Sequence, residues 1–587
     1  MIPERKGRAA LMCIVLPSRV RSLPGSQTGP RAGTRSPSLA VSVAVLAAAL
    51  AVLLGAGAAL AGKPCADVPL GHWSYALLER LESRGVVDID LSTLPVARTD
   101  VARAVREALE ARESGGLPVE LTERESWALD GLADEFLRGE VDTPVFSTED
   151  ERASFGLGVS LLTQGRYGPH SIEKEFWSGS VPGGITPERR DGGATLDVAV
   201  DSDDDSKLDF AADIDYELWG GFGDAIGFYA DSQLLLGGQE GARQVRLSNR
   251  VRTWRGISSE SHRAYLKLER PNYSVVLGRR GTAWGRSRWG RLLISGNAPT
   301  FDQLSVRCEV GALSFEAMHG FVEYVELGNE TDLGEAESVF LAGHRLVIEG
   351  DRGSLGLAEA VVYSSELPDP VYVNPLMPFY LAQHNEREND NIQWSVDGVY
   401  RFAPGLTAYG EFLIDDLQYE RHSKNPDKYG LTLGGAWYGA AAGFDVELTV
   451  EYTNVRNWTY THKHTEHRFA HDGLPIGFEL GPDADRVRAE LALHPVPELT
   501  VGVAYEHARK GEGSLDAQFV SGEGKDDTFP SGTVEATDRL SLEVGYQGLD
   551  RLTAGLGFAY ETVANAGNAP GENGDDVEFW AGVEVRM

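Results

Sequence analysis

After residue 150 the chain alternates between apolar and polar residues at successive positions. The clearest case is residues 392–418, where two alternating runs flank the turn 403–405. In the first run the apolar residues share one parity: Ile392, Trp394, Val396, Tyr400 and Phe402. Successive strand residues point to opposite faces, so each run predicts a strand with one apolar and one polar face. Each run is about as long as the roughly 9 to 11 residues that a tilted strand needs to cross a bilayer.

The same unit recurs to the end of the chain and predicts eighteen strands over residues 151–587. They begin near positions 153, 206, 223, 260, 273, 303, 311, 336, 353, 392, 406, 427, 441, 484, 498, 536, 549 and 576. Short turns follow the even-numbered strands and long loops follow the odd-numbered ones. This pattern is typical of outer-membrane β-barrels, and its phase puts both ends of the barrel segment in the periplasm. The alternative is a soluble β-sandwich, which gives no reason for regularly alternating loop lengths.

Two segments precede the predicted barrel. Residues 1–61 have basic residues, then an apolar run, then Ala59-Leu60-Ala61, and so predict a cleaved signal peptide. An uncleaved anchor helix is the alternative, because the run is about long enough to span a membrane. Residues 66–140 predict a small helical domain in the periplasm, with a capping box at Thr122 and Glu125.

Composition excludes several classes of protein. Hydrophobic residues make up 42% of the 587 residues, and the mean hydropathy is −0.24, so a bundle of membrane helices is excluded. The formal net charge of −34 argues against a nucleic-acid partner. The three cysteines provide neither a disulfide framework nor a metal cluster.

Part of the helical segment resembles a single S-layer homology module. The resemblance rests on Asp67-Val68-Pro69, His72-Trp73, Gly85-Val86-Val87 and Arg98-Thr99-Asp100. It implies binding of a peptidoglycan-linked polymer through Trp73 and Arg98. The usual threonine-arginine-glutamate order is altered here, and family members often carry three copies. The alternative is a plain periplasmic helical domain with Trp73 in its core.

Two blocks of the barrel segment, 275–299 and 374–391, resemble the Wzi family of capsule-assembly outer-membrane barrels. The motif residues are Gly278, Arg279, Gly285, Ser295, Asn297, Asn374, Pro375, Asp390 and Asn391. The resemblance implies a lectin-like protein, and not an enzyme, that helps to hold exopolysaccharide at the cell surface.

The predicted loop 282–302 carries the candidate sugar-binding residues. These are Trp284, Arg286, Arg288, Trp289 and Arg291. Indole faces stack on sugar rings and guanidinium groups pair with carboxylates, so an acidic exopolysaccharide fits this composition. The alternative is that the arginines pair with carboxylates inside the barrel while the tryptophans lie in the interfacial girdle. Arg279 and Arg280 are expected to be structural and to meet acidic residues of the lumen.

Other clusters predict no cofactor, no metal site and no catalysis. Asp201, Asp203 and Asp205 begin like a calcium loop, but the sequence lacks the glycine and the closing glutamate of that motif. His462, His464, His467 and His471 lack a tight metal-binding spacing. The sequence contains no nucleophile elbow or phosphate-binding loop.

These patterns together predict an outer-membrane barrel that binds or retains exopolysaccharide and is tethered to the wall by its N-terminal domain. Its expected partners are an acidic capsule or exopolysaccharide, a peptidoglycan-linked polymer and outer-membrane lipid. The alternative function is a wall-tethered general porin, because eighteen strands enclose room for an aqueous channel.

Overall fold

The computed structural model describes most of the chain after residue 65. The described residues are 66–138, 146–147, 153–169, 196–197, 206–222, 225–236, 257–326, 336–386, 389–418, 425–517, 519, 528–548 and 552–586. The predicted signal peptide and the aspartate-rich segment 201–205 lie outside these residues. None of the helices in the described part is long and apolar enough to span a membrane.

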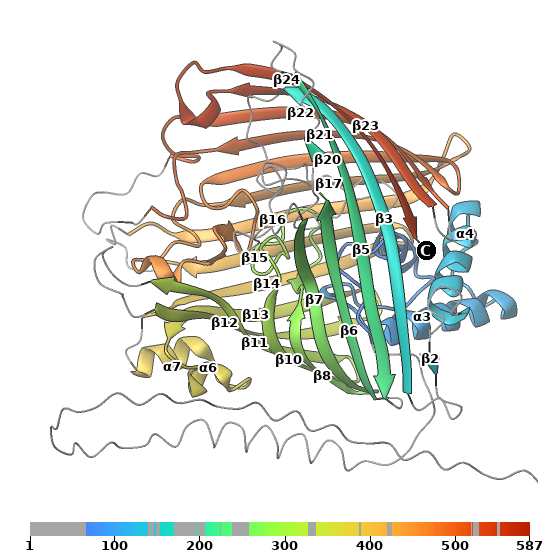
Figure 1. The fold of residues 1–587 in the computed structure, drawn as a ribbon, viewed down its shortest axis with the longest axis horizontal. Helices are drawn as coiled ribbons and strands as arrows, with labels where there is room; N and C mark the ends of the chain where they lie inside the picture. The colour runs from blue at the N-terminus through green and yellow to red at the C-terminus, as the bar shows by residue number, and fades with distance from the viewer. Residues whose placement is uncertain are drawn as a thin grey trace, which may run out of the picture. The chain divides into compact units, whose positions relative to one another are not determined.

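Eighteen long antiparallel strands close into a barrel (Figure 1). They are β3 (Ala153–Pro169), β5 (Ser206–Phe222), β6 (Ile226–Leu236), β7 (Ile257–Arg270), β8 (Tyr273–Arg280), β10 (Phe301–Val310), β11 (Leu313–Glu326), β12 (Ala336–Gly350), β13 (Gly353–Ser365), β14 (Asn391–Ala403), β15 (Leu406–Asp416), β16 (Lys428–Ala441), β17 (Phe444–Val455), β20 (Ala484–Val496), β21 (Leu499–Lys510), β22 (Glu535–Gln547), β23 (Leu552–Ala564) and β24 (Gly574–Arg586). Each pairs with the next along the chain, and β24 pairs with β3. The short strands β2 (Phe146–Ser147) and β4 (Leu196–Asp197) join this sheet. The predicted fold class is confirmed, and each predicted strand start lies within three residues of an observed one.

The barrel wall exposes apolar side chains and buries charged ones, the reverse of a soluble protein. On the outward parity Leu357 is 44% exposed, whereas the inward-facing Glu411 is 3% exposed and Arg345 is 1% exposed. An apolar exterior with a polar interior is the signature of a transmembrane barrel. The chain therefore folds as an outer-membrane-type β-barrel.

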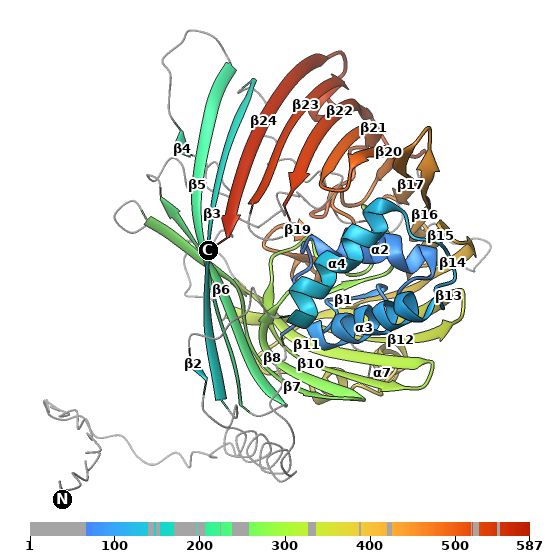
Figure 2. The same ribbon diagram turned by 90° about the vertical axis from the view of Figure 1, so that its right-hand side faces the viewer.

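A helical module, residues 66–138, lies at the end of the barrel that carries the short turns. It contains α2 (Ser74–Arg84), α3 (Arg98–Ser114) and α4 (Glu123–Ala133), followed by the π-helical turn η1 (Asp134–Arg138). Leucine and valine side chains from all three helices form its core, and the predicted capping box begins α4. Arg124 of α4 reaches the carbonyl oxygen of Pro497, and Gly405 N–H donates to the carbonyl oxygen of Ser83, both at short turns. Figure 2 shows the module inside the arc of strands from β8 to β17.

Two of the long loops carry structure that bears on function. After β8, which is only eight residues long, the chain turns inward, and β9 (Ala283–Trp284) pairs with β1 (Thr93–Leu94) of the helical module. Between β13 and β14 the chain forms α6 (Pro370–Val373) and α7 (Phe379–Glu386). The loop between β17 and β20 contains η2 (Thr465–His467) and the hairpin of β18 (Ala470–His471) and β19 (Leu474–Pro475). The loop between β23 and β24 contains η3 (Ala566–Asn568).

Candidate functional site

The helical module is fixed to the barrel wall by a buried ion-pair cluster, which we name the Asp67 latch. Asp67 accepts from Lys267 Nζ at 2.6 Å and from Arg280 Nη1 at 2.9 Å, and Arg280 also reaches Glu316 at 3.0 Å. All four side chains are buried. Burial alone would raise the pKa of Asp67, but Lys267 and Arg280 outweigh it and hold that pKa below its usual range. Two buried cations therefore hold the Asp67 carboxylate in its charged form.

Arg280 meets an acidic residue of the lumen, as the sequence predicts, but Arg279 does not. Arg279 points outward, where its Nη2 lies 2.9 Å from the exposed Asp302. The two residues are adjacent on one strand, so their side chains must face opposite sides of the wall.

A second ion-pair cluster holds helix α2. Arg80 is completely buried, and its guanidinium lies 3.2 Å from Glu125, 3.2 Å from Glu447 and 2.5 Å from Asp445. His494 Nε2 lies 3.1 Å from the same Glu447. Glu447 and Asp445 belong to β17, on the opposite side of the module from the Asp67 latch. The module is thus held on two sides.

The loop 281–300 lies inside the barrel, where it contacts the module and the inward-facing side chains of β15 and β17. Gly285 N–H donates to the carbonyl oxygen of Ser92 at 2.8 Å, next to the β1–β9 pairing. Trp284 is 1% exposed and packs in an apolar cluster inside the barrel. That cluster includes Leu292, Leu293, Ile294, Tyr460, Phe469 and Phe478. Trp284 is therefore an interior packing residue, and the alternative that placed it in the interfacial girdle is wrong.

Inward-facing carboxylates of the wall bind the backbone of this loop. Glu411 accepts from the N–H groups of Leu292 and Leu293 at 3.0 and 3.1 Å. Glu451 accepts from the N–H groups of Arg288 and Trp289 at 2.8 and 3.2 Å. The sequence alone does not distinguish either glutamate from its neighbours on the polar face. Both glutamates lie at polar positions of an alternating strand pattern, and many other acidic residues of the barrel do the same.

The arginines predicted to bind sugar have partners within the protein. Arg286 lies 2.7 Å from Glu82 of the helical module. Arg288 lies 3.6 Å from Glu490, and Arg291 Nε donates to the carbonyl oxygen of Gly285 at 3.0 Å. The alternative in which arginines pair with carboxylates inside the barrel therefore describes Arg286 and Arg288.

Trp289 lies between two guanidinium groups. The Arg288 and Arg488 groups are 5.6 and 4.7 Å from its ring centre. Arg286 is buried, whereas Arg288, Trp289 and Arg291 keep part of their surface accessible.

The first motif block shapes and fastens the inward loop. Gly278 has a φ of +131°, and a Cβ there would lie 2.3 Å from the carbonyl oxygen of Ala264, so only glycine fits. Ser295 Oγ donates to the carbonyl oxygen of Gly477 at 2.6 Å, and Asn297 Nδ2 donates to that of Pro475 at 2.9 Å. These two residues tie the loop 281–300 to the loop between β17 and β20.

The second motif block organises the neighbouring loops. Asn374 and Pro375 are exposed in the turn between α6 and α7. Asp390 accepts from the hydroxyl of Tyr372 at 2.5 Å, and Asn391 Nδ2 donates to the carbonyl oxygen of Tyr460 at 3.3 Å.

Three of the four histidines in the loop between β17 and β20 form one cluster. The rings of His462, His464 and His467 lie 5.3 to 5.6 Å from one another, whereas His471 packs edge-on against Phe301. Burial, His467 and Lys428 lower the pKa of His462 to about 3. Within the described residues, no group of three or more His, Cys, Asp or Glu side chains has a geometry that could hold a metal ion.

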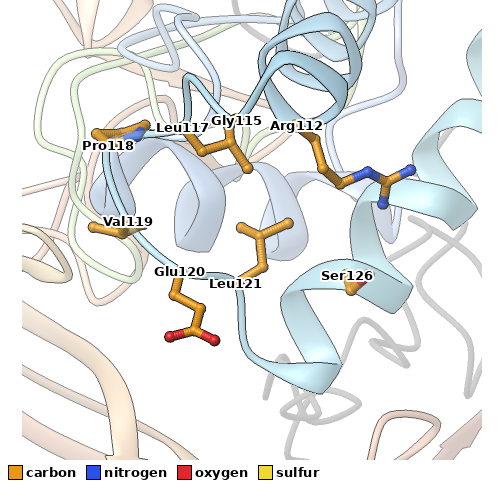
Figure 3. Close-up of a pocket in the computed structure, with 8 residues that line it drawn as sticks. All are labelled: Arg112, Gly115, Leu117, Pro118, Val119, Glu120, Leu121 and Ser126. Carbon is orange, nitrogen blue, oxygen red and sulfur yellow. The ribbon is translucent and has the colours of Figure 1, made fainter.

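The residues predicted to bind the cell wall lie in the packed helical module. Trp73 is half-buried against the module core. Arg98 Nη2 donates to Glu135 Oε1 at 2.8 Å, and its guanidinium lies 4.7 Å from the ring centre of Phe136. A hollow of about 470 Å³ on this module includes neither of them (Figure 3). It is lined by Arg112, Gly115, Leu117, Pro118, Val119, Glu120, Leu121 and Ser126.

The fold is similar to that of a solved outer-membrane barrel. No family model and no curated protein matches the sequence. Among solved structures, Wzi of Escherichia coli, an outer-membrane protein involved in group 1 capsule assembly and described as a carbohydrate-binding β-barrel, has a TM-score of 0.56 at 13% identity. That match covers 89% of this chain and 99% of Wzi, so it reaches into the residues that precede the barrel. OprD of Pseudomonas aeruginosa has a TM-score of 0.38 at 14% identity, covering 73% of this chain and 95% of OprD.

Proposed function

We propose that this protein is an outer-membrane barrel that binds or retains acidic exopolysaccharide at the cell surface. The packing of the module and the loop 281–300 inside the barrel carries this proposal. The helical module, the inward loop 281–300 and the wall share buried ion pairs and backbone hydrogen bonds. A rigid closed barrel is suited to present a binding surface. The short turns and the module then lie in the periplasm, and the long loops face outward.

The same observation disfavours the general porin. A porin conducts through a water-filled lumen. Here Arg80 and Arg280 are buried and paired across the module–wall contact, and separating such pairs costs several kcal/mol. We expect no steady large openings when the purified protein is placed in planar bilayers. Such openings in the wild-type protein would overturn the closed-barrel proposal.

Within the inward loop we propose that Arg288, Trp289 and Arg291 contact the polymer, while Trp284 and Arg286 position the loop. The first three are half-buried, whereas the other two are buried. At 3.6 Å, the Arg288–Glu490 contact exceeds hydrogen-bond length, so a sugar carboxylate competes with Glu490 for that guanidinium.

Binding of a labelled acidic polysaccharide to proteoliposomes tests this assignment. Replacing Arg288 or Trp289 with alanine removes a charge-assisted contact or a stacking surface, so affinity should fall by about tenfold, or ~1.4 kcal/mol. Arg103→Ala is the matched control, because Arg103 is an exposed residue of α3 with only weak ion pairs. Wild-type binding by both loop variants would overturn the site, and equal binding of neutral dextran would overturn the selectivity for acidic polymers.

We also propose that the helical module tethers the protein to the cell wall through Trp73 and Arg98. The resemblance to an S-layer homology module supports this proposal, and so does the place of the module beside the short turns. Co-sedimentation of the full-length protein with purified peptidoglycan sacculi should fall in Arg98→Ala and persist in Arg103→Ala. Equal sedimentation of the Arg98→Ala and Arg103→Ala variants would contradict wall binding through Arg98.

A further inference from the structure

Helices α6 and α7 pack on the outer face of the barrel wall. Tyr372 of α6 and Phe379 of α7 are buried against the apolar side chains Phe340, Val361 and Ile392 of β12, β13 and β14. These strand residues share the outward parity of the exposed side chains Leu346, Leu355, Leu357 and Val396. Figure 1 shows the two helices beside the ends of β12 and β13. The segment between β13 and β14 therefore covers the lipid-facing side of the wall.

A buried carboxylate fixes α7 in this place. Glu359 has the outward parity of β13, where an uncovered charge would face lipid at high cost. It accepts from the backbone N–H groups of Phe379 and Tyr380 at 2.9 and 2.8 Å, and from Trp394 Nε1 at 2.8 Å. His344 Nε2 lies 3.2 Å from it. Because the first N–H groups of a helix favour an anion, α7 both neutralises and covers Glu359.

The side of this segment that faces away from the wall is apolar. Leu376 is 78% exposed, and Leu367, Val373 and Leu381 are also exposed. Between residues 367 and 383 the only charged residue is Asp369, although 24% of the whole chain is charged. Asp369 itself caps α6 by accepting from the N–H of Val371 at 2.7 Å. An exposed apolar surface on an otherwise strongly charged protein requires an apolar neighbour.

Aromatic residues mark the level of this surface in the membrane. Tyr380 of α7 and Trp394 of β14 are in edge-to-face contact at 5.7 Å, and both are partly exposed. Tyrosine and tryptophan side chains with one polar end gather at the boundary between lipid tails and headgroups. Trp394 lies two residues from Val396 on the same face of β14, so the α7 contact places this apolar surface beside the exposed band that includes Leu357 and Val396. We therefore expect the membrane around the barrel to cover this apolar surface.

We propose that residues 367–383 form an interfacial hairpin that lies in the membrane leaflet at the long-loop end of the barrel. Leu376 and Leu381 contact lipid acyl chains there, while Glu359 and the Tyr372–Phe379 packing hold the hairpin to the wall. The hairpin fixes the depth at which the long loops emerge from the membrane. This inference depends on the barrel fold and not on what the long loops bind.

Fluorescence quenching by lipid tests the proposal directly. The full-length protein, with its native cysteines replaced by serine, is labelled with an environment-sensitive fluorophore at Leu376→Cys. The label is measured in phosphatidylcholine vesicles that contain lipids with spin-labelled acyl chains. Leu357→Cys is the lipid-exposed control, and Ala566→Cys, in the loop between β23 and β24, is the water-exposed control. Quenching at Leu376→Cys should match Leu357→Cys and exceed Ala566→Cys by at least about threefold, because the label sits at the acyl-chain boundary.

Two results would overturn the proposal. The first is quenching at Leu376→Cys no greater than at Ala566→Cys, which would place the hairpin in water. The second is efficient disulfide cross-linking between Leu376→Cys copies without lipid quenching, which would assign this surface to a second copy of the chain. A folding defect is excluded in either case if the labelled variants keep the heat-induced gel shift of the folded barrel.

Discussion

Arg280 of strand β8 donates to the carboxylate of Asp67 across 2.9 Å and so joins the barrel wall to a residue 213 positions earlier in the chain. The same guanidinium reaches Glu316 of β11 at 3.0 Å. Arg280, which belongs to β8, therefore links the helical module to the inner side of both β8 and β11. This contact and the Arg80 cluster on the opposite side explain how a small helical module is held inside a wide barrel.

Replacing Arg280 with alanine should loosen the module. The variant leaves Asp67 and Glu316 buried with less compensating charge, and breaking a buried pair typically costs about 3–5 kcal/mol. We expect a lower unfolding temperature in detergent and new channel openings in planar bilayers. Arg279→Ala is the matched control, because Arg279 points to the other side of the wall and pairs with Asp302 outside the latch. Equal effects of the two substitutions would show that the latch does not hold the module.

The ion pairs of the Asp67 latch should persist in mild acid and break in strong acid. The pKa of Asp67 in the folded protein lies below its usual value of 3.8. Its stabilisation is therefore fully present above that value and is lost as the pH falls through the folded pKa. Conductance should stay low from about pH 8 to pH 5 and rise only below about pH 4. Asp67→Asn should be less stable at neutral pH and lack this acid transition; a transition near pH 6 in the wild type would point to another group.

The inward loop should not tolerate a side chain at position 290. A Cβ on Gly290 would lie 1.9 Å from Thr453 Oγ1, whereas one on Gly574 would meet nothing within 4 Å. Gly290→Ala must displace the loop from the wall, so we expect destabilisation of about 1–3 kcal/mol, as for other overpacked cores. Gly574→Ala should behave as wild type. Urea unfolding of both variants in lipid vesicles provides the measurement, and similar midpoints would contradict the observed packing.

Cys308 tests the proposed orientation of the barrel. It is free, exposed and close to the short turn that joins β10 to β11. If the short turns face the periplasm, a membrane-impermeant maleimide should not label Cys308 in intact cells but should label it after the outer membrane is permeabilised. A cysteine introduced at Ala566, in a long loop, should be labelled in intact cells. Labelling of Cys308 in intact cells would reverse the orientation.

The strands were predictable because their signal is local. A strand facing lipid on one side and a polar interior on the other must alternate with a period of two, and β14 and β15 follow that rule from Ile392 to Asp415. The capping box of α4 is equally local, because it involves residues three positions apart. Such features need no knowledge of the rest of the fold.

The position of the loop after β8 in the folded protein could not be predicted in the same way. Its tryptophans and arginines suit a sugar-binding surface, yet Trp284 is buried and Arg286 is paired with Glu82. Which of the many inward carboxylates receive the loop backbone depends on distances across the barrel. Glu411 and Glu451 have the same sequence signature as other acidic residues on the polar face.

By itself, the sequence determined the number of strands, their alternation between an apolar and a polar face, and the existence of a helical segment, because hydrophobic period and capping act between near neighbours. The tertiary structure alone decided that the helical module and the loop 281–300 pack inside the barrel and that α6 and α7 cover the outer wall. These outcomes depend on contacts such as Arg280–Asp67 and Glu359–Tyr380. Such contacts join residues 21 and 213 positions apart, so they depend on how distant parts of the chain pack together.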